Sequence, residues 1–157
     1  MSQSNFGSLR VSLRKAAMLA LLTAAPVLGF AKDAALVVAK NSKVNAIQSA
    51  AFMKAFKSAP ARLADGEEIV LVVKALDARE TQIVGRKLLM QTLEGLNEAA
   101  ARRTIIVVSS DEEVIRIVGN SPNAVGVVDV YSITGAIKVV KVDGKLPLEP
   151  GYLLRYN

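Results

Sequence analysis

Three pairs of polar residues follow apolar runs in this sequence, and their types suit the binding of a small anion. Asn41 and Ser42 follow the first run, Arg79 and Thr81 the second, and Ser109 and Ser110 the third. Amide, hydroxyl and guanidinium groups donate hydrogen bonds. Each pair also lies near a predicted helix N-terminus, which offers unpaired N–H groups and the positive end of a dipole. These six residues are our candidate ligand-binding site, and the predicted ligand is a small oxyanion such as phosphate.

Ordinary structural roles explain the same residues, and the sequence leaves both explanations open. Arg79 is the most suggestive of the six, because a cation near a helix N-terminus is locally unfavourable. An ion pair with Asp77 or Glu80 would offset that charge, and so would a bound anion. Helix capping explains Ser109 and Ser110, and turn chemistry explains Asn41 and Ser42.

The apolar runs that precede these pairs have the composition of buried strands. We predict strands over residues 35–39, 69–75, 104–108 and 124–130. Runs without polar interruption are typical of strands that are covered on both faces, as in parallel sheets. If the sheet is parallel, the loops after the first three strands open at one edge, where sheets of this class bind ligands. The three polar pairs are then expected to converge.

Helical patterns alternate with the predicted strands, which indicates an α/β fold. The predicted helices begin between Asn45 and Ser49, at about Arg79 and after Ser110, with the second ending near Gly95 and a further helical turn over residues 97–103. Phe52 and Phe56 are predicted core residues, and Ser110 with Glu113 forms a capping box. Residues 137–142 and 145–148 flank Asp143-Gly144, a hairpin signal. The expected fold is a mixed, mostly parallel sheet flanked by helices, with a C-terminal β-hairpin.

The N-terminus has the pattern of a cleaved secretory signal. Arg10, Arg14 and Lys15 precede the apolar residues 16–28, and small residues allow cleavage after Ala31. The apolar stretch is shorter than the roughly 20 residues that span a bilayer, although an uncleaved anchor is the alternative. We therefore predict a signal peptide over residues 1–31, a single domain over residues 32–157, and export to the periplasm.

Composition argues against an enzyme and against a nucleic-acid-binding protein. The chain has no His and no Cys, so the commonest general base and the thiolate nucleophile are missing. No cofactor or metal motif is present. Without the three basic residues of the predicted signal, 17 basic and 14 acidic residues remain, a net charge of +3. That charge suits an anionic ligand, whereas nucleic-acid binding usually needs a basic stripe or stacking aromatics.

Three stretches of the chain resemble the phosphate-binding-protein-like family, the periplasmic solute-binding components of phosphate ABC transporters. They are the strand–loop–helix of residues 36–56, Arg79-Glu80-Thr81 opening a helix, and residues 109–114 followed by 121–128 and 137–144. The resemblance covers residues 35 to about 150 and is greatest to short, single-lobe members. It implies a periplasmic-binding-protein-like fold of type II, non-catalytic oxyanion capture and a membrane transporter as partner.

The chain departs from that family at two points, which leaves two functions open. Leu76-Asp77-Ala78 stands where the family has Ser-Gly-Thr, and the chain is long enough for about one of the family's two lobes. One hypothesis is an exported solute-binding-like protein that captures a small oxyanion. The alternative is a single lobe that has lost ligand binding and serves as an interaction module for another envelope protein. Convergence of Ser42, Arg79 and Ser110 in one concave site would favour the first.

Overall fold

A six-stranded mixed sheet forms the centre of the molecule, in the order β4-β3-β5-β1-β6, with β8 also pairing with β1. The computed structural model describes residues 32–62 and 66–156. The strands are β1 (Lys32–Ala39), β3 (Val70–Lys74), β4 (Ile105–Val108), β5 (Ala124–Asp129), β6 (Ile137–Val139) and β8 (Arg155–Tyr156). The predicted α/β class with a mixed sheet is confirmed, and the apolar runs became the strands.

Strand β1 runs in the opposite direction to the other five. β3 pairs in parallel with β4 and β5, whereas β1 pairs antiparallel with β5, β6 and β8. The sheet is thus mostly parallel, as expected. The loop after β1, however, opens at the edge opposite to the loops after β3 and β4. The expectation that the first three loops share one edge is wrong, because an apolar run does not encode its direction in the sheet.

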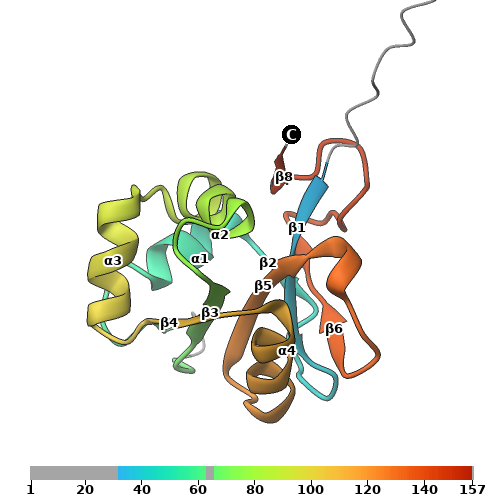
Figure 1. Cartoon of the computed structure of the whole chain (residues 1–157), viewed down its shortest axis with the longest axis horizontal. Helices are drawn as coiled ribbons and strands as arrows, with labels where there is room; N and C mark the ends of the chain where they lie inside the picture. Colours follow the sequence, from blue (N-terminus) through green and yellow to red (C-terminus); the bar gives the residue numbers. More distant parts are fainter. Residues whose placement is uncertain (1–31, 63–65, 157) are drawn as a thin grey trace, which may run out of the picture.

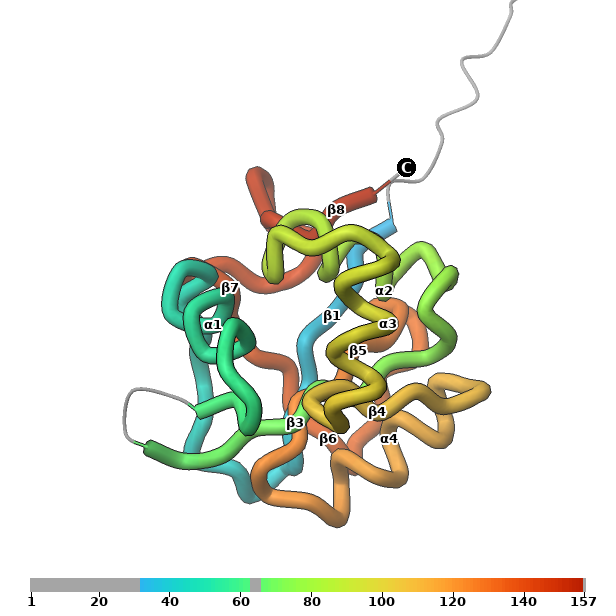
Figure 2. Tube along the Cα trace, turned by 90° about the vertical axis from the view of Figure 1, so that its left-hand side faces the viewer, coloured from blue at the N-terminus to red at the C-terminus, as the bar shows by residue number. Residues whose placement is uncertain are grey.

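Helices cover both faces of this sheet (Figures 1 and 2). α1 (Ser49–Ala55), α2 (Arg79–Val84), the π-helical turn η1 (Gly85–Leu89) and α3 (Leu93–Ala101) lie on one face, and α4 (Asp111–Asn120) lies on the other. Phe52 and Phe56 are buried on the first face with ring centroids 4.8 Å apart, which confirms them as core residues.

The strand side chains alternate between two apolar clusters, as expected for strands covered on both faces. Leu36 belongs to the cluster that contains residues of α1, α2 and α3, while Val37 belongs to the cluster that contains residues of α4. The contact between α4 and β5 is close, because a methyl group on Gly126 would lie 2.7 Å from Val118 and 2.8 Å from Val114. This packing fixes the N-terminus of α4 beside the end of β5.

The helix after β3 is shorter than predicted. It changes to the π-helical turn at Gly85 and ends at Met90, whose φ is 54°. α3 begins at Leu93, where the Thr92 side chain accepts a hydrogen bond from the Gly95 N–H. Gly95 therefore lies in the first turn of the next helix, and the prediction that it ends the preceding helix is wrong. The missed signal was the N-cap threonine.

The C-terminal hairpin is reduced to its turn. Asp143 and Gly144 have φ of 49° and 82°, and Val142 and Lys145 exchange hydrogen bonds of 2.9 and 3.0 Å. The expected second arm is not a strand; instead β7 (Lys141–Val142) pairs in parallel with β2 (Ala46–Ile47). The expected signal peptide lies outside the described residues. Within those residues, no helix has the length and apolar character to cross a membrane.

Candidate functional site

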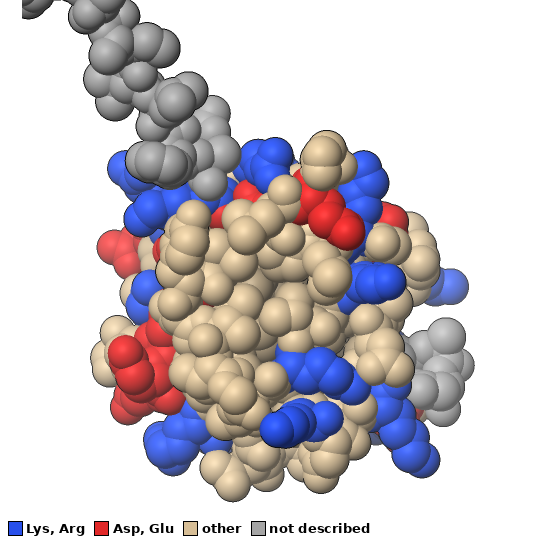
Figure 3. All heavy atoms as spheres, turned by 90° about the vertical axis from the view of Figure 1, so that its right-hand side faces the viewer, with Lys and Arg blue, Asp and Glu red and all other residues tan. Residues whose placement is uncertain are grey.

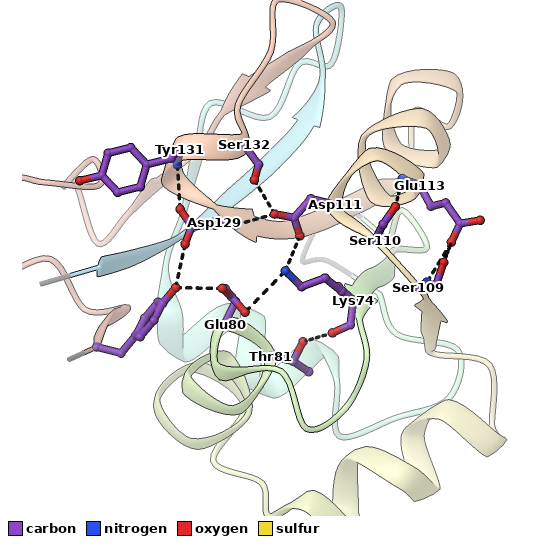
Figure 4. A network of polar contacts seen from close by, with 11 residues as sticks. Lys74, Glu80, Thr81, Ser109, Ser110, Asp111, Glu113, Asp129, Tyr131 and Ser132 are labelled. Carbon is purple, nitrogen blue, oxygen red and sulfur yellow. Dashed lines mark hydrogen bonds and ion pairs between the residues drawn. The ribbon is translucent and has the colours of Figure 1, made fainter. Parts of the chain in front are cut away.

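A polar network lies at the edge of the sheet where β3, β4 and β5 end (Figure 4). Lys74 is the last residue of β3, Asp111 the first of α4, and Asp129 the last of β5. Because these strands are parallel, their last residues and the loops after them meet at this edge. Glu80 from α2 and Tyr156 from β8 complete the network.

Asp111 is the centre of the network. Its side chain is 9% exposed, and its Oδ1 lies 3.1 Å from Lys74 Nζ. Its Oδ2 accepts hydrogen bonds from the Ser132 hydroxyl at 2.6 Å and from the Asp129 N–H at 3.4 Å. A carboxylate with a cation and neutral donors around it is bound as a free oxyanion would be. The chain thus supplies an anion of its own at the N-terminus of α4.

Tyr156 joins the two other carboxylates of the network. Its hydroxyl oxygen lies 2.9 Å from Glu80 Oε1 and 3.1 Å from Asp129 Oδ2. Glu80 Oε2 is also 4.0 Å from Lys74 Nζ. These contacts hold the C-terminal strand against α2 and the end of β5.

The edge has more negative than positive charge. Burial lowers the pKa of Lys74, but the hydrogen bond and charge of Asp111, with Glu80 and Asp129, outweigh burial and raise it. Lys74 therefore stays protonated against three carboxylates. A phosphate dianion at this edge would meet net repulsion. Within the described residues, no three acidic side chains are placed to hold a metal ion.

Ser109 and Ser110 take the capping role that the sequence offered as their alternative. The Ser110 hydroxyl accepts the Glu113 N–H at 3.3 Å. Glu113 Oε2 accepts the Ser109 N–H at 2.8 Å and the Ser109 hydroxyl at 2.7 Å, and these bonds lower the pKa of Glu113. The capping box forms, with its return bond at Ser109 instead of Ser110.

The first predicted pair, Asn41 and Ser42, does not converge with the serines. Asn41 and Ser42 follow β1 and lie at the opposite edge, where the Ser42 hydroxyl accepts the Val44 N–H at 3.2 Å, a local turn. The buried Thr81 donates its hydroxyl to the Lys74 carbonyl at 2.8 Å. The expected convergence of Ser42, Arg79 and Ser110 is therefore wrong.

Arg79 lies at the rim of the network, in a separate pocket of about 280 Å³ lined by Asp77, Arg79, Gln82, Arg86 and Tyr156. Its side chain is exposed. In the part of the chain that the structure describes, no carboxylate forms an ion pair with Arg79, and Glu80 contacts Lys74 and Tyr156 instead. The ion pair with Asp77 or Glu80 that the sequence suggested is absent.

Sequence reasoning missed five site residues of this network: Lys74, Asp111, Asp129, Ser132 and Tyr156. One signal was available: Lys74 and Asp129 are the single charged residues of the predicted strands over residues 69–75 and 124–130, each one position before the predicted end. A charged residue in that position marks the point where a buried strand reaches the surface. Which of these ends meet, however, depends on strand direction and order.

The buried tyrosines predict unfolding at alkaline pH. Burial and then the Asp33 charge raise the pKa of Tyr152, and burial followed by the Glu80 contact raises that of Tyr156 above the usual 10.0. A phenol whose pKa is raised by folding contributes stability that is complete below pH 10 and is lost as the pH rises further. In the Tyr131→Phe variant, which keeps only these two tyrosines, tyrosinate absorbance and loss of circular dichroism should rise together above pH 10. Tyrosinate formation near pH 10 in a folded protein would contradict this prediction.

Comparisons with known proteins show the fold. No family model and no curated protein matches the sequence, but solved structures do. They include an ABC-type phosphate transport receptor from Vibrio cholerae (16% identity, TM-score 0.62, 80% of this chain and 54% of that one). A proposed phosphate ABC transporter substrate-binding protein with bound phosphate, from Clostridium perfringens, has 16% identity, a TM-score of 0.65 and coverage of 80% and 53%. PstS from Borrelia burgdorferi has 17% identity, a TM-score of 0.63 and coverage of 81% and 55%.

This likeness confirms the predicted periplasmic-binding-protein fold. The chain spans about half the length of the phosphate receptors that it matches, which corresponds to a single lobe. The similarity is to binding proteins and not to enzymes.

Proposed function

We propose that this chain, which has the fold of one lobe of the phosphate receptors, is an exported, non-catalytic interaction module whose central edge does not capture free oxyanions. The observation that carries the proposal is the position of Asp111. Its carboxylate is bound by Lys74, Ser132 and the Asp129 N–H, the groups that would otherwise receive an oxyanion. An intramolecular carboxylate has a high effective concentration, so a free anion competes poorly with it.

The other carboxylates support the same proposal. Glu80 and Asp129 would repel a second anion, and the first turn of α4 already holds three acidic residues, Asp111, Glu112 and Glu113. These side chains compensate the positive end of the helix dipole. Oxyanion capture, our first hypothesis, therefore has little support at this edge.

The surface offers room for a protein partner. Figure 3 shows that the face on the β6 side has a broad area without Lys, Arg, Asp or Glu, with charged side chains around its margin. Two large apolar side chains, Tyr131 and Leu148, are 69% and 56% exposed. An uncharged centre with a charged margin is typical of protein interfaces.

A thermal-shift series tests the proposal directly. Phosphate, sulfate and molybdate are added to the purified protein at equal ionic strength, with chloride as the control. Because a ligand that binds the folded state raises the midpoint by mass action, we expect no shift beyond that of chloride. A phosphate-specific shift that disappears in Lys74→Met would contradict the proposal and restore the oxyanion hypothesis.

Photo-crosslinking from position 131 in the cell envelope, with the exposed position 54 as control, tests for a partner.

A further inference from the structure

We propose that the pocket between α2, η1 and β8 docks an acidic segment of a partner protein. This inference rests on the proposed function, because it names the chemistry of the partner. The pocket has a volume of about 280 Å³, and its walls include two arginines, Arg79 and Arg86, together with Tyr156 of β8.

No described carboxylate pairs with either of the two arginines. Both side chains are exposed, and within the described ranges neither forms an ion pair. Arg62, Arg102 and Arg155, by contrast, each pair with a carboxylate. Two unpaired guanidiniums in one concave site attract an anionic partner, and guanidinium groups favour bidentate contacts with carboxylates.

The spacing of the arginines favours an extended segment over a small ion. Arg79 and Arg86 are seven residues apart on a continuous helical run, which places their backbones about 10 Å apart on one side. Each guanidinium can then take a carboxylate of its own, whereas a single phosphate would engage both arginines only if their side chains bent toward one another. An extended peptide advances about 3.3 Å per residue, so carboxylates two to four residues apart can reach both arginines.

Other groups in the pocket suit a peptide backbone. Gln82 Nε2 donates to the Leu76 carbonyl at 2.6 Å, which leaves the Gln82 Oε1 as an acceptor. The Asp77 carboxylate is a second acceptor in the same pocket. Peptide N–H groups donate to such acceptors, whereas an unprotonated inorganic anion such as sulfate has only oxygen lone pairs to offer. Donors for carboxylates next to acceptors for N–H groups are the complement of an acidic peptide.

The wall formed by Tyr156 is fixed before any partner binds. The Tyr156 hydroxyl contacts Glu80 and Asp129, and the neighbouring Arg155 is paired with the buried Asp33. A preformed wall lowers the entropic cost of binding. This side of the pocket is therefore in place before a partner binds.

Fluorescence polarisation with the full chain tests this inference. The probe is a labelled ten-residue peptide with glutamates at three alternate positions, and the control peptide has glutamine at the same positions. We expect the acidic peptide to bind, binding to weaken with salt, and Arg79→Ala/Arg86→Ala to weaken it about tenfold, as two ion pairs of ordinary strength predict. Arg116→Ala removes an exposed arginine of α4 and should leave the affinity unchanged. Asp77→Asn should strengthen binding.

Three results would overturn the inference, and a fourth would reject only the proposed function. Equal binding of the glutamine peptide would remove the role of charge, and equal weakening in Arg116→Ala would mean non-specific attraction. Phosphate binding that disappears in the double arginine variant would make the pocket a small-anion site and reject the peptide. Phosphate binding that survives the double variant but is lost in Lys74→Met would reject the proposed function alone, and the peptide measurements would still decide for or against this pocket.

Discussion

The Asp111→Ala variant is expected to be less stable than the wild type by about 2 kcal/mol and to regain part of that loss in formate. The substitution removes a buried carboxylate that pairs with Lys74 and accepts the Ser132 hydroxyl. Hydrogen bonds to charged groups contribute about 1.5–3 kcal/mol. It also leaves Lys74, Ser132 and the Asp129 N–H around an empty space of carboxylate size.

Formate has the carboxylate that this space lacks, so it should act as a replacement. At ten times its dissociation constant, a ligand of the folded state returns about 1.4 kcal/mol. Asp111→Asn is the matched control, because its amide fills the space and admits no anion. Urea unfolding of both variants in formate and in chloride makes the measurement. Rescue of both variants, or of neither, would mean that Asp111 does not occupy an anion site.

The same experiment bears on why this edge differs from the expected ligand site. Glu80 and Asp129 remain in the variant, so a dianion such as phosphate should rescue less than the monoanion formate does. A stronger effect of phosphate would indicate that the edge retains oxyanion selectivity once Asp111 is removed.

Local chemistry in this chain could be predicted from the sequence, but long-range direction could not. The apolar runs gave the strands, Phe52 and Phe56 gave the core, and Ser110 gave the start of α4. Each of these features depends on neighbours within a few residues. The reversal of β1 depends on its pairing with β5, about ninety residues later, and no local pattern reports such a pairing.

The candidate site shows the consequence of that limit. Asn41 and Ser42 were grouped with Ser109 and Ser110 on the assumption of one edge, and the reversal of β1 separates them. The residues that do meet, Lys74, Asp111 and Tyr156, come from three elements whose order in the sheet had to be known first. The residue types predicted that polar side chains come directly after the strands. The order and direction of the strands determined which of those side chains contact one another.

The second large effect concerns the ion pair that fastens the C-terminal strand. Asp33 is fully buried, its Oδ1 accepts Arg155 Nε at 2.9 Å, and its Oδ2 accepts the Leu148 N–H. The Arg155 side chain is 36% exposed. The two partners therefore differ in what their removal leaves behind: a buried carboxylate in one case and a partly hydrated guanidinium in the other.

We expect Arg155→Ala to lower the free energy of unfolding more than Asp33→Ala does, because it leaves a fully buried carboxylate without its cation. Asp33→Ala should cost about 1–3 kcal/mol. Urea unfolding of both variants and of the double variant gives the coupling energy. The double variant should be more stable than the sum predicts, because the arginine has little left to stabilise once Asp33 is absent. Additive losses, or a larger loss from Asp33→Ala, would mean that the buried carboxylate does not depend on Arg155.

Because β8 also carries Tyr156, Arg155→Ala should weaken binding of the acidic peptide as well, which links the stability of this strand to the docking pocket that it borders.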